Sequence, residues 1–135
     1  MYTIYFGDSI IYVMERITVA EARKRGLLKT QKSKSKYGNK RTFYNGRWYD
    51  SQKESLRAVE LDTLLKSGVV KKWTPQVRYD FTHNGVKICT YVLDFKIEYS
   101  CGKIEYEDVK GFKTEIYKLK KKMMKAFYQI EIKET

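Results

Sequence analysis

Residues 69–110 constrain the fold most, because they are rich in β-branched and aromatic side chains and are broken only by short turn signals. The apolar runs predict four strands, at 69–73, 77–81, 86–98 and 103–110. The strands are separated by combinations that favour a turn or a break, namely Pro75, Asn84-Gly85 and residues 100–102. A meander of this length needs a covering layer, because a sheet must bury at least one face.

Helical patterns precede and follow these strands. Ser51-Gln-Lys-Glu54 fits a capping box and opens a helix that runs to about Lys66, with Gly68 as its stop. Thr114 is an expected N-cap for a second helix at 115–126. The order of elements predicts an α/β fold, a mixed β-sheet flanked by helices at about 52–66 and 115–126.

The end of the chain supplies further expectations. In the helix at 115–126 and just beyond it, Ile116, Leu119, Met123 and Phe127 recur at the spacing of a core-facing stripe. Residues 127–132 alternate polar and apolar side chains, which predicts a closing strand.

The first third of the chain contains shorter patterns. Residues 2–6 and 9–13 predict a hairpin, residues 18–21 form a capping box that opens a short helix before Gly26, and Asn45-Gly46 predicts a tight hairpin within 42–49. At 135 residues the length corresponds to one domain. Its expected organisation is an N-terminal appendage at 1–13, a short helix with a flexible basic arm at 14–41, and a core at 42–135.

The charge balance indicates an anionic partner. Lys and Arg number 28 against 16 Asp and Glu, so the formal charge is +12, and such an excess attracts polyanions. Nucleic acid is the expected partner, and an anionic membrane is the alternative. No apolar run approaches the roughly 18 residues that span a bilayer, and no signal-peptide pattern opens the chain. We therefore expect a soluble, cytoplasmic protein with no membrane partner.

Two basic segments are candidates for phosphate contacts. Residues 29–41 hold six basic residues and no acid, so they form either a solvated tether or a DNA-contacting arm. The last helix presents lysines that either contact phosphates or form a solvated face. The candidate DNA-binding residues are Lys36, Lys40, Arg41, Lys113, Lys118, Lys120 and Lys122.

A pair of aspartates is the strongest chemical signal. If the turn between the last two strands of the meander comprises residues 100–102, Tyr99 pairs with Lys103 and Asp94 lies directly opposite Asp108. Facing like charges are destabilising and need a counter-charge. Mg²⁺ or Mn²⁺ would supply it and would also bind a phosphate substrate. The alternative is that both aspartates are exposed polar positions of an amphipathic hairpin.

Three further residues could belong to the same site as the two aspartates. The two-residue period places Lys110 on the face of Asp108, where its ammonium could orient water or stabilise charge on a phosphate. Glu107 points to the opposite face and is the second choice for the acidic position. Glu54 either serves its own capping box or delivers another carboxylate to the metal. Cys89, Cys101 and the single His83 do not have the spacing of a zinc site.

From Met14 onward the chain resembles a family. It is similar to small phage- and prophage-encoded proteins of unknown function. The segments that match are Lys36-Tyr-Gly-Asn-Lys, Asp50-Ser-Gln-Lys-Glu54, Tyr91-Val-Leu-Asp94-Phe and above all Glu107-Asp-Val-Lys-Gly111. Those proteins are grouped with the PD-(D/E)xK nucleases. The resemblance implies a restriction-endonuclease-like core in which Glu54, Asp94, Asp108 and Lys110 are the metal and catalytic set. The backbone carbonyl of Val109 is implied as a further ligand. Leu93 replaces the proline of the superfamily's name.

The resemblance also implies an activity. It indicates a Mg²⁺- or Mn²⁺-dependent DNA endonuclease that acts on branched DNA or recombination intermediates in phage DNA metabolism within the bacterial host cytoplasm, similar to Holliday-junction resolvases. By analogy such enzymes are homodimers. Two other classes remain open: a non-catalytic basic DNA-binding or architectural module, and an interaction protein of a recombination or packaging complex.

Overall fold

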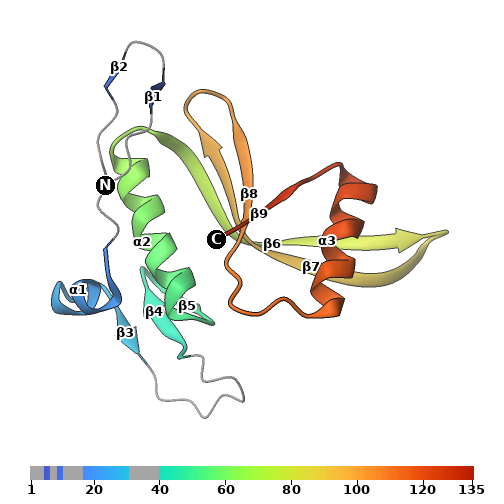
Figure 1. Cartoon of the computed structure of the whole chain (residues 1–135), viewed down its shortest axis with the longest axis horizontal. Coiled ribbons are helices and arrows are strands. Elements are labelled where there is room, and N and C mark those ends of the chain that lie inside the picture. Colours follow the sequence, from blue (N-terminus) through green and yellow to red (C-terminus); the bar gives the residue numbers. More distant parts are fainter. Residues whose placement is uncertain (1–4, 7–8, 11–16, 31–39) are drawn as a thin grey trace. The chain divides into compact units, whose positions relative to one another are not determined.

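The computed structural model describes residues 5–6, 9–10, 17–30 and 40–135. The described residues form a mixed α/β structure with three helices, a four-stranded mixed sheet and smaller hairpins (Figure 1). Contacts divide the chain into two compact units, Met1–Glu60 and Leu61–Thr135. None of the helices in the described residues is long and apolar enough to cross a membrane.

Unit 1 confirms two of the short patterns, the helix that begins after Thr18 and the tight turn at Asn45-Gly46. Most of the predicted hairpin at 2–13 and of the predicted arm at 29–41 lies outside the described residues. Thr18 caps the first helix, where its hydroxyl oxygen accepts from the Glu21 N–H at 3.1 Å. Asn45 and Gly46 adopt positive φ in the predicted tight turn. Ala22, Leu28 and Val59 form the small core. The elements are β1 (Tyr5–Phe6) paired with β2 (Ser9–Ile10), α1 (Val19–Lys24), and a sheet of β3 (Lys29–Thr30), β4 (Thr42–Tyr44) and β5 (Arg47–Tyr49).

Helix α2 (Gln52–Lys66) matches the predicted bounds and runs from one unit into the other. It ends because Gly68 adopts φ 80°, which turns the chain out of the helix. Its last part is tied to the second unit by a bond from the Trp73 indole N–H to Asp62 Oδ1 at 3.0 Å.

Unit 2 contains the four-stranded sheet, whose strand order is β6-β7-β8-β9. Strands β6 to β8 are antiparallel, and β8 and β9 are parallel. Helix α3 (Glu115–Tyr128) lies across the β6–β7 hairpin (Figure 1). The strands are β6 (Val70–His83), β7 (Val86–Tyr99), β8 (Ile104–Asp108) and β9 (Ile132–Glu134). The core beneath α3 consists of Phe81, Tyr91, Leu93, Tyr117, Met124 and Ile132.

The prediction of two strands separated by Pro75 was wrong, because β6 runs continuously from Val70 to His83. The strand tolerates proline because β6 is the edge of the sheet, where a missing N–H need not disrupt pairing. Pro75 pairs with Phe95 and Val77 with Leu93, so Gln76 stands opposite Asp94. Gln76 has φ 51°, an uncommon conformation for a residue within a strand.

The predicted closing strand at 127–132 was also wrong. Phe127 and Tyr128 belong to α3, and Gln129 ends that helix in the left-handed conformation, with φ 57°. The N–H of Gln129 bonds to the carbonyls of Lys125 and Met124, which satisfies the end of the helix. The strand that follows, β9, therefore starts at Ile132 and pairs with β8.

The predicted core-facing stripe of α3 is largely exposed. Ile116, Leu119 and Phe127 are 67%, 59% and 48% exposed, whereas Tyr117 and Met124 are buried against the sheet. Successive helix positions differ by about 100°, so the buried face begins one position later than the predicted stripe. The prediction failed in part because α3 has apolar side chains on two faces: Met123 and Phe127 of the predicted stripe still contact the core, but Tyr117 and Met124 are the buried residues of the helix.

Candidate functional site

The β7–β8 hairpin has the register predicted from the sequence. The Tyr99 N–H donates to the Lys103 carbonyl at 2.8 Å, and Phe95 pairs with Glu107. One step further along this register, Asp94 stands opposite Asp108. Asp108 is completely buried, and the Asp94 side chain is 14% exposed. The two carboxylates are therefore held close together by the sheet itself.

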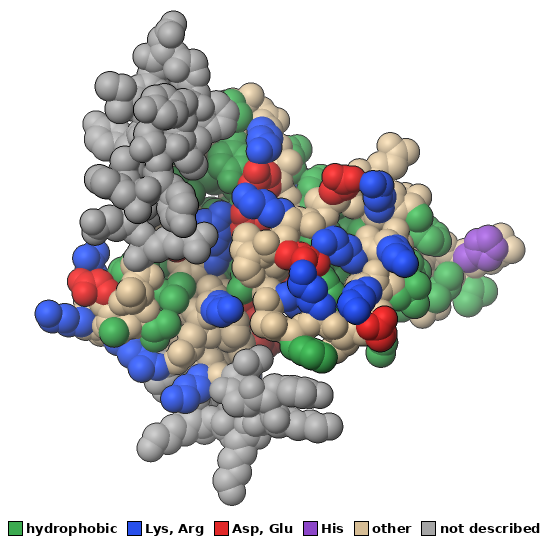
Figure 2. Space-filling model, in the orientation of Figure 1, with side chains coloured by type: hydrophobic (Ala, Val, Ile, Leu, Met, Phe, Trp, Pro, Cys, Tyr) green, Lys and Arg blue, Asp and Glu red, His purple; other side chains and the backbone are tan. Residues whose placement is uncertain are grey.

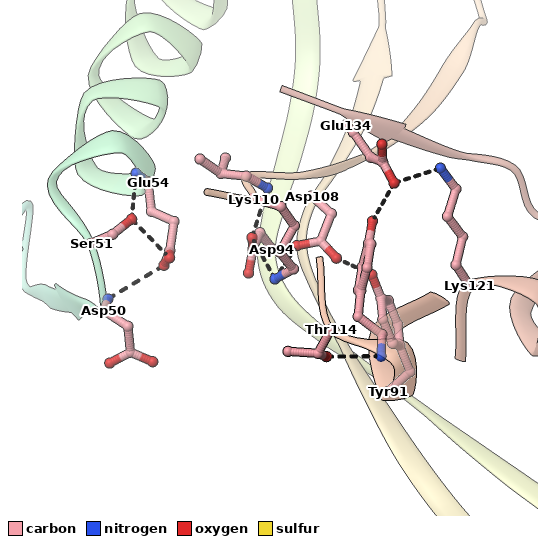
Figure 3. Close-up of polar contacts among 12 residues, drawn as sticks. Asp50, Ser51, Glu54, Tyr91, Asp94, Asp108, Lys110, Thr114, Lys121 and Glu134 are labelled. Atoms are coloured by element: carbon pink, nitrogen blue, oxygen red, sulfur yellow. Dashed lines mark hydrogen bonds and ion pairs between the residues drawn. The ribbon is translucent and has the colours of Figure 1, made fainter. Parts of the chain in front are cut away.

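Lys110 supplies one positive charge to this pair of aspartates. Its ammonium lies 2.6 Å from Asp108 Oδ1 and 3.7 Å from Asp94 Oδ2 (Figure 3). Oδ1 of Asp108 is buried and accepts no aligned hydrogen bond from the described residues, so its contact with Lys110 is an ion pair. Strand β8 ends at Asp108, and Lys110 reaches the aspartates from the segment that follows rather than from the strand.

The backbone around Val109 is fixed on both sides. Its N–H donates to Asp94 Oδ2 at 2.8 Å, which links the two strands through the site. On the other side, the Thr135 N–H donates to the Asp108 carbonyl at 3.1 Å, and the Lys110 N–H donates to the Thr135 carbonyl at 3.3 Å. The last residues of the chain thus hold the segment that carries Asp108 and Lys110.

Tyr91 contacts the remaining oxygen of Asp108. The phenol donates a short hydrogen bond to Asp108 Oδ2 (Figure 3). Burial, followed by the hydrogen bond to Asp108, raises the pKa of Tyr91 far above its ordinary value, so the hydroxyl remains a donor at any working pH. This bond fixes the rotation of the carboxylate and directs Oδ1 toward Lys110.

A second polar cluster connects α3 and β9 beside the aspartates. The Lys110 ammonium lies 5.5 Å from the centre of the Tyr117 ring, and the Tyr117 hydroxyl donates to Glu134 Oε1 at 3.0 Å. Lys113 and Lys121 also donate to Glu134. These two lysine hydrogen bonds lower the pKa of Glu134 to about 2.

Replacing Glu134 by glutamine is expected to lower stability at neutral pH by about 1 kcal/mol, because the lysines lose their charged partner. The lowered pKa of Glu134 means that its contribution is present above the ordinary value of 4.5 and is lost as the pH falls toward 2. Denaturant unfolding of both proteins at pH 7 and pH 3 measures this. The difference in the free energy of unfolding between the two proteins should be smaller at pH 3 than at pH 7. An equal difference at both pH values would contradict the stabilising role of the Glu134 carboxylate.

The donor set fits a hard cation. Mg²⁺ and Mn²⁺ favour oxygen ligands, and Mg²⁺ is commonly held by one or two carboxylates while it keeps water and substrate oxygens. Asp94 and Asp108 provide two carboxylates, one of them with a buried oxygen whose only counter-charge among the described residues is the Lys110 ammonium. Within residues 61–135 no group of three or more His, Cys, Asp or Glu side chains is placed to hold a metal, so a closed structural site is not present there.

The comparison with known protein families adds one match. A family model described as a protein of unknown function, DUF1064, matches residues 34–135. The chain belongs to the DUF1064 family. Neither the curated proteins nor the solved structures contain a match. The matched region of this DUF1064 protein includes Glu54, Asp94, Asp108 and Lys110, and excludes unit 1 up to residue 33.

Glu107 in the DUF1064 chain faces a different environment from Asp108. It is completely buried and lies 3.7 Å from the ammonium of Lys133, its partner in β9. Lys133 also contacts Glu105 at 3.2 Å, so Glu105 and Glu107 share one side of β8. Burial raises the pKa of Glu105, but hydrogen bonds from Lys103, Tyr99 and Lys133 outweigh it and lower that pKa to about 2.

Glu54 makes local bonds at the start of α2, of which the bond from its own N–H to Ser51 is that of a capping box. Its Oε1 accepts from the Ser51 hydroxyl at 3.0 Å, and its Oε2 accepts from the Asp50 N–H at 3.3 Å (Figure 3). The Glu54 N–H donates to the Ser51 oxygen at 3.2 Å. These contacts favour the capping role in unit 1, and the role of Glu54 as a metal ligand stays a prediction.

The candidate DNA-binding residues lie in varied settings. Lys36 falls outside the described residues. Arg41 pairs with Asp50 at 3.2 Å, Lys118 pairs with Glu115 at 2.7 Å, and Lys120 donates to the Thr90 carbonyl at 2.8 Å. Lys113 bonds Glu134, and Lys40 and Lys122 are exposed. Figure 2 shows basic side chains over α3 interspersed with acidic ones.

Three residues of the site were missed by the sequence reasoning: Tyr91, Tyr117 and Glu134. Tyr91 lies three positions before Asp94 on the same strand, so period-two counting gives no reason to place it near Asp108. Glu134 reaches the site through the parallel pairing of Asp108 with Glu134, and pairing between strands separated by a helix leaves no local pattern. Tyr117 would have been found only if the buried face of α3 had been assigned correctly.

Proposed function

We propose that this DUF1064 protein is a metal-dependent DNA endonuclease with a restriction-endonuclease-like core, acting on branched DNA or recombination intermediates. The observation that carries the proposal is the arrangement of Asp94, Asp108 and Lys110 across one hairpin, with two adjacent carboxylates and an ammonium between them. The formal charge of +12 supports a polyanionic substrate.

The residues of the proposed site would have different roles in the reaction. Asp94, Asp108 and the Val109 carbonyl would hold Mg²⁺ or Mn²⁺, with Glu54 as a predicted further ligand. When bound, the cation would supply Lewis acidity toward the phosphate and a more acidic water. The Lys110 ammonium, which pairs with Asp108 in the absence of a cation, would turn to the negative charge that develops on the phosphate.

Tyr91 and the backbone give the proposed site its rigidity. Tyr91 holds Oδ2 of Asp108, and the Val109 N–H holds Oδ2 of Asp94. These bonds leave Asp108 Oδ1 directed at the Lys110 ammonium. Asp94 and Asp108 would therefore already be oriented to hold Mg²⁺ or Mn²⁺, and the Lys110 ammonium would give up its ion pair with them.

A panel of labelled DNAs tests the proposal. Single-stranded, duplex, flapped and four-way DNA would be incubated with Mg²⁺, Mn²⁺ or EDTA, and the products resolved on denaturing gels. We expect endonucleolytic products with either cation, most of all from branched DNA, and none with EDTA. Because symmetrical cutting of a junction needs two sites, the proposal includes a homodimer, which sedimentation measures on the same samples. The absence of any metal-dependent product across the panel would overturn the proposed activity.

Replacing Tyr91 by phenylalanine is expected to raise the Mg²⁺ concentration needed for half-maximal cleavage by about 10-fold, because the Asp108 carboxylate loses the bond that orients it. The rate at saturating Mg²⁺ should change less than this. A Mg²⁺ titration of cleavage measures both quantities. Tyr79→Phe is the matched control, because Tyr79 lies in the same sheet and its ring packs against Tyr128. An unchanged Mg²⁺ requirement in Tyr91→Phe would remove Tyr91 from the proposal.

A non-catalytic DNA-binding module is the second candidate function. It is favoured by the pairing of Lys110 with both aspartates, since the ammonium offsets one of their two negative charges and occupies the position of a cation. This function predicts salt-sensitive DNA binding that is unaffected by EDTA, with no cleavage of any DNA in the panel.

A further inference from the structure

The segment between β8 and α3 exposes an aromatic ring beside the proposed site. Phe112 is 78% exposed, the highest value among the exposed large hydrophobic side chains described. It follows Lys110 by two positions, so at most about 7 Å of chain separates the two Cα atoms. Gly111 between them borders open space, because a Cβ atom placed there would meet no atom within 4 Å.

Phe112 has an apolar neighbour in the sequence and no ring partner in the part of the chain that the structure describes. Within the described residues, none of the aromatic ring contacts involves Phe112. Ile116, four residues further on in the first turn of α3, is 67% exposed. These two side chains, called here the Phe112 patch, therefore offer apolar surface that the sheet does not cover.

The charge around the Phe112 patch narrows the class of partner. Residues 110–125 contain seven lysines and one glutamate. Five of these lysines pair with carboxylates, and Lys120 and Lys122 add further positive charge to the segment, so a ligand that covers the patch gains most if it is anionic. Nucleic acid combines phosphates with flat apolar base faces, and aromatic side chains beside basic residues are its usual single-strand platform. A continuous duplex hides the base faces within the stack, and only an unpaired or unstacked base exposes one.

We infer that Phe112 stacks on an unpaired base next to the phosphate that Lys110 would contact at the proposed site. The protein should accordingly prefer DNA with unpaired or unstacked nucleotides to continuous duplex. This inference rests on the proposed function and extends it from DNA in general to a class of DNA structure.

Binding without divalent metal tests the inference independently of cleavage. Fluorescence anisotropy in EDTA would compare a single-stranded oligonucleotide with the same sequence as duplex. We expect Phe112→Ala to weaken single-strand binding at least about fivefold and duplex binding less than twofold, while Phe112→Trp retains both. Ile88→Ala is the matched control, because Ile88 is 57% exposed on the β6–β7 hairpin, and it should change neither affinity.

A 2-aminopurine base in the single strand provides a direct readout of stacking. Its fluorescence should be quenched by the wild-type protein and by Phe112→Trp, and much less by Phe112→Ala. Equal losses of single-strand and duplex affinity in Phe112→Ala, or unchanged quenching, would overturn the stacking role. If selective binding is found but no DNA is cut, the nuclease proposal fails and the stacking role stands. If cutting depends on Asp108 while Phe112→Ala binds DNA normally, the nuclease proposal stands and the stacking role fails.

Discussion

Replacing Asp108 by asparagine is expected to lower the rate of metal-dependent cleavage of branched DNA at least about 100-fold. Asparagine keeps the volume of the completely buried side chain and can still accept the Tyr91 hydrogen bond. It removes the negative charge that pairs with Lys110 at 2.6 Å and that would hold the cation. Cleavage rates at saturating Mg²⁺, with DNA affinity measured in parallel, separate a chemical loss from a binding loss.

Glu107→Gln is the matched control for Asp108→Asn. The two acids are neighbours in sequence and both are completely buried, but Glu107 lies beside Lys133 whereas Asp108 lies beside Lys110. We expect Glu107→Gln to retain most of the cleavage rate in whatever fraction remains folded. Loss of activity in Glu107→Gln together with normal activity in Asp108→Asn would show that Glu107, and not Asp108, is the acidic residue of the site.

Replacing Met124 by alanine is expected to destabilise the protein by about 2–5 kcal/mol, because the side chain is completely buried beneath α3 and leaves a cavity when it is shortened. For a chain of this size that loss lowers Tm by roughly 10 °C. Thermal unfolding followed by circular dichroism measures it, provided that the transition is reversible.

Ile116→Ala makes the same kind of change on the other apolar face of α3. Ile116 is 67% exposed, so its truncation should change stability by no more than about 0.5 kcal/mol. A large loss in Ile116→Ala and a small one in Met124→Ala would show that the predicted stripe, rather than the observed face, packs on the sheet. The pair therefore measures the orientation of the helix directly.

Local signals predicted much of the fold because they act over a few residues. Thr18, Asn45-Gly46 and Gly68 each adopt the cap or turn conformation that their sequence context favours. The bounds of α2 follow from such signals at both ends. The continuous strand β6 was missed because local rules treat Pro75 as a break, whereas its tolerance depends on β6 being an edge strand.

Some residues of the candidate site were likewise predictable from local signals, and others are positioned only by tertiary packing. The opposition of Asp94 and Asp108 could be counted from the sequence once a three-residue turn was assumed, because such a turn leaves one register, and the structure confirms that register. Tyr91, Tyr117 and Glu134 joined these aspartates only in the tertiary structure. Their positions depend on how α3 and β9 pack on the hairpin, and the free energy of packing depends on contacts between residues far apart in the chain.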